Sequence, residues 1–199
     1  MHRSLRCLAV AVTMSLAAAP VFAAGDPAAE RAKSFCNALV DSVRQSKGQP
    51  VQARIKRLEP LVDDSFNIQV MAQFATAPAW ANTSEPDRRA LVLALARYSA
   101  ARLAQEFDTY SGQSCAIDPS VQTRGSDKLV KTRILQPSAT PVALNYRFRE
   151  YQGAWKIVDL YYDGVSQLAT ERADFASVLQ AKGSPGLVKR LNELTSNLR

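Results

Sequence analysis

Few side chains in this sequence could support acid–base, nucleophilic or metal chemistry. The only histidine is His2, which lies in an N-terminal segment with the features of a cleaved export signal. Without an imidazole, neither a Ser-His-Asp triad nor a Cys-His pair can form. The cysteines and carboxylates do not show the ligand spacing of a zinc site, and no glycine-rich phosphate loop occurs. We therefore expect no catalytic residue, no metal site and no cofactor.

Pairs of carboxylates are the remaining candidates for chemistry. Two acids that flank a cleft can act as acid and base, and three pairs could be imagined in this role: Asp63 with Asp64, Asp159 with Asp163, and Glu171 with Asp174. Acids at helix ends and turns are usually solvated caps. We interpret all three pairs as structural and expect that the protein is not an enzyme.

The first 23 residues have the pattern of a signal peptide. Arg3 and Arg6 precede an apolar run from Cys7 to Ala18, which is shorter than the roughly 18 apolar residues that suggest a membrane helix. Val21 and Ala23 supply the minus-three and minus-one positions of a cleavage site, and no lipid-anchoring cysteine follows them. The sequence predicts that residues 1–23 are removed and that residues 24–199 form one domain in the periplasm.

Two cysteines, Cys36 and Cys115, remain after this cleavage. An even number of cysteines in an oxidising compartment favours a disulfide, which would join the first expected helix to the first expected strand. Two buried free thiols are the alternative.

The charge of the chain is mildly basic. The net charge is +7 for the full sequence and falls by two when Arg3 and Arg6 are removed. Lysines and arginines are scattered among acids, so a solvated surface explains them and we expect no nucleic-acid partner. The excess could still favour an anionic surface or an acidic partner.

Helical periodicity dominates the first half of the chain and its end. Apolar residues recur at three- and four-residue steps in each segment, and Pro60 predicts a kink or break near Glu59. Starts are indicated by capping residues and prolines. The expected helices begin at Asp26-Pro27, after Pro50, at Asn67, at Ser84, at Ser166 and after Ser184-Pro185.

The middle of the chain changes to a period of two, which is typical of strands. Val142, Leu144, Tyr146 and Phe148 alternate with polar residues. Turns are expected at residues 124–127, 152–153 and 163–164. These features predict four antiparallel strands, over residues 115–123, 129–135, 142–149 and 155–162. The fold class is therefore α+β.

Two blocks of sequence resemble a known family. The first block is Phe66-Asn67, Met71-Ala72, Phe74-Ala75, Trp80, Tyr110 and Gly112-Gln113; the second is residues 153–160, 163–166, Arg172, Phe175 and 183–191. Together they resemble the MlaC-type, or toluene-tolerance, family of periplasmic lipid carriers. Residues 166–175 are more similar to the hopanoid-associated HpnM branch than to the phospholipid-shuttle branch.

This resemblance implies helices packed over a curved four-stranded antiparallel sheet, with a deep apolar pocket for acyl chains between them. The periodicity alone favours a solid core, since single apolar residues of this kind are more often core than pocket wall. From the resemblance we expect the following residues to line the pocket and bind lipid: Met71, Phe74, Leu95, Tyr98, Phe107, Tyr146, Phe148, Trp155, Ile157, Val158 and Val165.

The resemblance also implies cargo and partners. The cargo would be a phospholipid or a hopanoid, moved between an inner-membrane lipid transporter and an outer-membrane lipoprotein complex. Headgroup contacts by Arg97, Arg102, Arg147 or Arg149 are left out of the site, because exposed arginines are ordinary. The rival interpretation is a non-catalytic scaffold of such a complex, with a solid interior; an enzyme that acts on a lipid ranks third.

Overall fold

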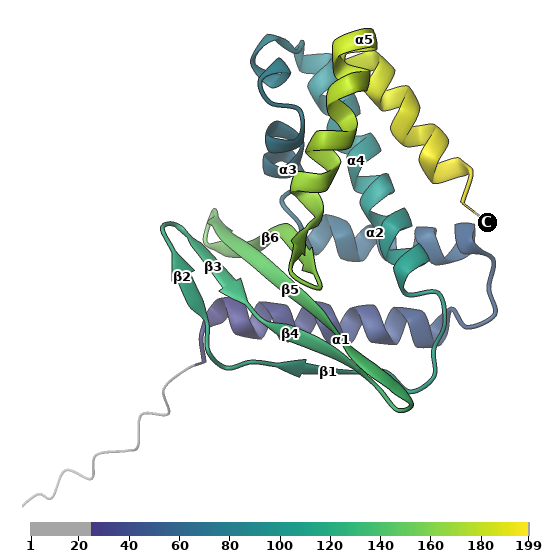
Figure 1. The fold of residues 1–199 in the computed structure, drawn as a ribbon, viewed down its shortest axis with the longest axis vertical. Coiled ribbons are helices and arrows are strands. Elements are labelled where there is room, and N and C mark those ends of the chain that lie inside the picture. The colour runs from purple at the N-terminus through teal and green to yellow at the C-terminus, as the bar shows by residue number, and fades with distance from the viewer. Residues whose placement is uncertain (1–24, 199) are drawn as a thin grey trace, which may run out of the picture.

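The computed structural model describes residues 25–198, so the predicted signal peptide lies outside the described residues. Its first half is helical (Figure 1). The elements are α1 (Pro27–Gln45), α2 (Val51–Ser65), α3 (Ile68–Ala75), the 3-10 helix η1 (Ala79–Asn82) and α4 (Glu85–Glu106).

The helix starts predicted from capping residues are confirmed. The Asp26 side chain accepts a hydrogen bond from the backbone N–H of Ala28 at 2.9 Å. Asn67 caps α3 in the same way through Val70, at 3.1 Å. Ser84 caps α4, where its side chain accepts from the N–H of Asp87. Each cap satisfies an N–H group that has no partner within its own helix.

The predicted break at Pro60 is not found, because α2 continues to Ser65. Proline inside a helix costs about 3 kcal/mol through a lost hydrogen bond and a steric clash. Ile55, Leu58 and Val62 are all buried on one face of α2, and each contributes roughly 1.5–3 kcal/mol on burial. Packing of this face therefore outweighs the local preference.

The sheet follows α4 and is antiparallel, with β5 at its centre (Figure 1). One edge of β5 pairs with β3 and β4 in turn, and the other pairs with β6. The strands are β1 (Ser114–Ile117), β2 (Gln122–Arg124), β3 (Asp127–Val130), β4 (Thr132–Gln136), β5 (Ala139–Tyr151), β6 (Ala154–Tyr162) and β7 (Val165–Ser166).

The α+β class is confirmed, but the prediction of four strands is wrong, since the sheet has seven. The predicted first strand is divided into β1 and β2 around Pro119, which has no N–H to donate to a ladder. The second is divided into β3 and β4 at Lys131. There the N–H of Thr132 donates to the side chain of Asn145, at 3.1 Å, instead of to a backbone carbonyl.

The turn predicted between the two longest strands is confirmed. Gln152 and Gly153 connect β5 to β6 with φ values of 50° and 79°. Positive φ at both central positions matches the twist of a two-residue hairpin, and glycine adopts it without steric cost.

The two helices predicted near the C-terminus are segments of α5 (Gln167–Ser196). They meet at Gly183, whose φ of 62° and ψ of −168° are not helical. Ser166 caps the first segment through the N–H of Ala169, at 3.0 Å.

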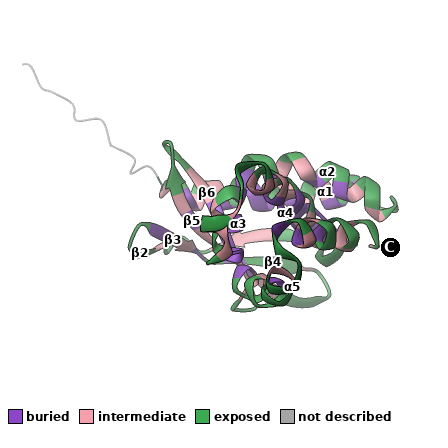
Figure 2. Cartoon of the chain, turned by 90° about the horizontal axis from the view of Figure 1, so that it is seen from above, coloured by how far each residue is buried: buried purple, intermediate pink, exposed green. Residues whose placement is uncertain are grey.

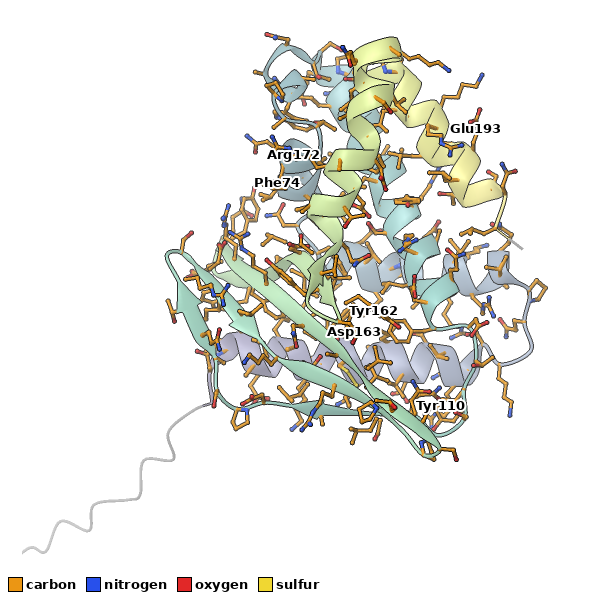
Figure 3. The ribbon with its side chains drawn as sticks, viewed as in Figure 1. Phe74, Tyr110, Tyr162, Asp163, Arg172 and Glu193 are labelled. Carbon is orange, nitrogen blue, oxygen red and sulfur yellow. A yellow bond between two sulfur atoms is a disulfide. The ribbon has the colours of Figure 1, made fainter. Side chains whose placement is uncertain are left out.

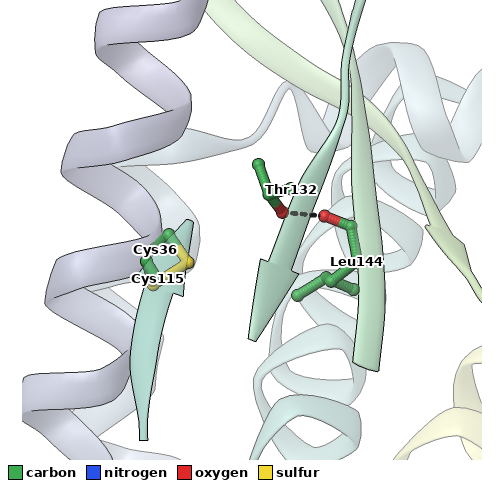
Figure 4. The surroundings of a disulfide bond; sticks show 4 residues. All are labelled: Cys36, Cys115, Thr132 and Leu144. Carbon is green, nitrogen blue, oxygen red and sulfur yellow. Dashed lines mark hydrogen bonds between the residues drawn. A yellow bond between two sulfur atoms is a disulfide. The ribbon is translucent and has the colours of Figure 1, made fainter. Parts of the chain in front are cut away.

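The core lies where the helices face the sheet and one another, as the burial colours of Figure 2 show. The Phe35 ring of α1 packs edge-on against Tyr146 of β5 and against Phe66, with ring centroids 5.4 Å apart in each pair. Beside it, Cys36 and Cys115 form a disulfide between α1 and β1, with Cα atoms 6.1 Å apart (Figure 4).

Candidate functional site

An apolar pocket lies between helices α3, α4 and α5 and strands β5 and β6. Its cavity volume is about 50 Å³. Eight of its lining residues are apolar or aromatic: Phe66, Met71, Leu103, Phe107, Leu144, Leu160, Tyr162 and Leu168. The other five are polar or charged: Ser99, Arg102, Glu106, Gln167 and Glu171.

The strand side of the pocket follows from the register of β5 and β6. Leu144 is opposite Tyr162, and Tyr146 is opposite Leu160. These four residues share the face of the sheet that the helices cover, because side chains directly opposite each other point to the same side. The pocket therefore has a floor of leucine and tyrosine side chains.

The helix side comes from single faces of α4 and α5. Ser99, Leu103 and Glu106 are spaced by four and three residues on α4, so they lie on one face. Leu168 and Glu171 are three residues apart near the start of α5, so they also lie on one face of their helix. Both faces combine apolar and charged groups, so the pocket has a polar wall as well as an apolar floor.

The polar wall contains an arginine and a carboxyl group that do not form an ion pair with each other. Arg102 pairs with Glu106 along α4, at 3.3 Å, and its guanidinium lies 3.5 Å from Oε1 of Gln167. The Oε2 atom of Glu171 is buried and has no hydrogen-bond partner among residues 25–198. Burial raises the pKa of Glu171 to about 7; Arg102 opposes this shift, whereas Asp159 and Asp174 add to it.

Asp159 organises the start of α5. Its carboxylate accepts hydrogen bonds from the Ser166 hydroxyl at 2.6 Å and from the N–H of Leu168 at 3.1 Å. Burial raises the pKa of Asp159, although these two hydrogen bonds act in the opposite direction. This acid therefore fixes the helix that carries Leu168 and Glu171 into the pocket.

Two of the residues predicted to bind lipid, Met71 and Phe107, line this pocket. Met71 is buried on α3, and Phe107 ends α4. Five others lie in the buried core and do not line the pocket: Leu95, Tyr146, Phe148, Ile157 and Val158.

The remaining four predicted residues lie nearer the surface and outside the pocket lining. Tyr98 packs edge-on against Phe175, with ring centroids 6.3 Å apart. Trp155 has the ammonium of Lys128 over its ring, at 4.6 Å. Phe74 is 41% exposed and Val165 is 57% exposed.

Most of the residues that line the pocket were not predicted from the sequence. Leu144 and Tyr162 belong to strands that were predicted, and the alternation of β5 places Leu144 on the inner face. Arg102 was considered and left out. Glu171 was considered only as a carboxylate pair with Asp174 and interpreted as structural, and nothing in the local pattern distinguishes Gln167 from other polar residues of an exposed helix.

Within residues 25–198, no group of three or more His, Cys, Asp or Glu side chains could hold a metal ion. None of the helices over the same residues is both long and apolar enough to cross a membrane.

The chain is similar to known proteins in both sequence and fold. Residues 33–193 match the MlaC protein family. A phospholipid-binding protein from Ralstonia solanacearum, solved in complex with a phospholipid, has a similar fold with a TM-score of 0.74 and 18% sequence identity. The similarity covers 87% of this chain and 98% of the Ralstonia chain. Because the family match extends over most of its length, this protein belongs to the MlaC family.

Proposed function

We propose that this protein is a periplasmic carrier that binds the apolar tails of a membrane lipid in the pocket between α3, α4, α5 and the sheet. The observation that carries the proposal is this pocket in a member of the MlaC family. The Ralstonia protein of similar fold, solved with a phospholipid, supports the same ligand class.

Burial of acyl chains supplies enough free energy for such a function without a catalytic group. Each methylene removed from water contributes about 0.8 kcal/mol. The cavity of about 50 Å³ is small compared with the roughly 300 Å³ of the smallest common ligand pockets. Binding therefore requires a wider pocket, and we propose that it opens when α3 and the first segment of α5 separate from each other and from the sheet.

The cargo that we propose is a phospholipid or a hopanoid. The first choice is supported by the Ralstonia protein, and the second by the likeness of residues 166–175 to the HpnM branch. The carrier would move lipid between an inner-membrane transporter and an outer-membrane lipoprotein complex. A lipid moves along differences in affinity, so no enzymatic step is needed.

Native mass spectrometry of the mature protein, purified from the periplasm of its own cells, tests this function. The expected result is a stoichiometric adduct that organic extraction identifies as phospholipid or hopanoid. Empty protein that also takes up no lipid from vesicles would contradict the carrier function and favour a scaffold with a solid interior. Turnover of any lipid by the purified protein would instead indicate an enzyme.

A further inference from the structure

The polar wall of the pocket presents an acid that no protein group satisfies. Glu171 lines the pocket from α5, and its Oε2 atom has no hydrogen-bond partner among the described residues. Arg102 lines the same pocket from α4, yet it pairs with Glu106 on its own helix. A buried polar atom without a partner costs about 1–3 kcal/mol. Such a group in a binding pocket therefore suggests a partner that arrives with the ligand.

Burial, with a smaller contribution from nearby acids, keeps Glu171 mostly neutral below about pH 7. Titratable groups face it from α4, from α5 itself and from β6, whereas α3 and β7 contribute none. These groups are Tyr98, Arg102, Glu106, Asp159, Tyr162 and Asp174. Acids outnumber the single arginine, and burial raises the pKa of Glu171 to about 7.

We propose that Arg102 and Glu171, which line one wall of the pocket, form a binding site for the phosphodiester oxygens of a phospholipid whose tails occupy the pocket. This inference rests on the proposed function and narrows its cargo to a lipid that carries a phosphate. Gln167 is a positioning residue, since its side chain accepts from Arg102 and donates to the carbonyl of Val165 at 3.1 Å.

The donor chemistry favours a phosphate over other lipid groups. A neutral carboxylic acid has one O–H to donate, and a guanidinium has only donors. Two donors on one wall match an anionic acceptor, and hydrogen bonds to charged groups are about twice as strong as neutral ones. A lipid without a phosphate, such as a diacylglycerol, offers only weaker acceptors.

Ionisation of Glu171 has the opposite effect. The carboxylate loses its donor and repels the phosphate, so affinity for phospholipid falls as the pH rises through the pKa. The limiting slope for one such proton is about tenfold in affinity per pH unit. Arg102 is then the only donor of the pair left for the phosphate, and the carboxylates of Glu106 and Glu171 compete with the phosphate for the guanidinium.

The test is uptake from vesicles of dioleoyl phosphatidylglycerol that contain dioleoylglycerol, with the bound lipid identified by native mass spectrometry. We expect preferential uptake of the phospholipid at about pH 6, with a loss of roughly tenfold per unit above pH 7. Glu171→Gln, which keeps a donor, should retain uptake at about pH 8. Arg102→Gln should lose the preference for phospholipid. Glu193→Gln removes an exposed acid from the same helix and should behave as the wild type.

Dioleoylglycerol uptake that equals phospholipid uptake, or that follows the same pH curve, would overturn the phosphate site and leave the carrier function intact. Absence of uptake of either lipid at every pH would overturn both. A second measurement needs no variant: the pKa of the Glu171 carboxyl, followed by NMR, should rise when phospholipid is loaded, and an unchanged value would contradict the site.

Discussion

The guanidinium carbon of Arg172 on α5 lies 5.0 Å from the centroid of the Phe74 ring on α3 (Figure 3). The two residues are close in sequence to Glu171 and Met71, which line the pocket. Phe74 was predicted to bind lipid, but it is 41% exposed. Its contact with Arg172 joins the two helices that would separate in the proposed opening of the pocket.

Loss of this contact should speed the entry and exit of lipid. A cation–π pair at an exposed site contributes about 0.5–1 kcal/mol, so Arg172→Gln should increase the rate of phospholipid transfer between vesicles about two- to fivefold. The melting temperature should change little. Arg190→Gln makes the same change of charge at an exposed position of α5 and serves as the control. Equal transfer rates in both variants would show that the pair does not limit opening.

Two residues that the sequence analysis grouped together should behave differently. Met71 lines the pocket and is buried, whereas Val165 is 57% exposed. Met71→Gln places an amide among apolar side chains, at a cost of roughly 1–3 kcal/mol, and should reduce the amount of lipid that copurifies. Val165→Gln should leave it unchanged. Native mass spectrometry of the two folded variants measures the bound lipid. A larger loss in Val165→Gln than in Met71→Gln would mean that lipid binds elsewhere.

Local features of the sequence predicted the elements well because short-range chemistry determines them. Asp26, Asn67 and Ser84 cap the helices that they were expected to begin. The alternation in residues 142–149 identified the inner face of β5. The division between β1 and β2 has a local signal, Pro119, that was overlooked. The division between β3 and β4 depends on a side chain thirteen positions away: Asn145 accepts the N–H of Thr132 that a ladder would otherwise use.

The pocket was harder to predict than the elements because a β-bulge changes the inward face of β6. Phe148 is opposite Ile157, but Arg147 is opposite Asp159, so the register shifts between them. Regular alternation from Ile157 would turn Asp159 and Tyr161 inward. After the bulge, Leu160 and Tyr162 face the pocket instead. Single-sequence patterns do not reveal this extra residue.

The disulfide between Cys36 and Cys115 should contribute strongly to stability. It closes a loop with a sequence separation of 79 residues, and restriction of the unfolded chain by such a loop is worth about 4 kcal/mol. Chemical unfolding of the protein with and without reductant should show this difference. The double variant Cys36→Ala/Cys115→Ala should match the reduced protein and not respond to reductant. Alkylation of both thiols without reduction would contradict the bridge.

The pKa of Glu171 predicts an unusual dependence of stability on pH. In the unfolded chain this carboxyl ionises near 4.5, whereas burial raises its pKa to about 7 in the folded protein. Between these values the unfolded state binds fewer protons, so the free energy of unfolding falls as the pH rises from about 4.5 to about 7. The expected decrease is about 3 kcal/mol, after which the curve levels off.

Glu171→Gln should remove most of this slope and stabilise the protein at neutral pH. A smaller slope should remain, because burial also raises the pKa of Asp159. Asp127 affects the free energy of unfolding in a different pH range. Burial raises the pKa of Asp127, but hydrogen bonds from Arg149 and Arg147 outweigh burial and lower the pKa below 3.8, so the stability that Asp127 contributes is lost only at pH values below 3.8. Urea unfolding at several pH values measures the slope, with Glu193→Gln as the control. Parallel curves for the wild type and Glu171→Gln would show that Glu171 ionises normally in the folded protein, because only a shifted pKa couples its ionisation to folding.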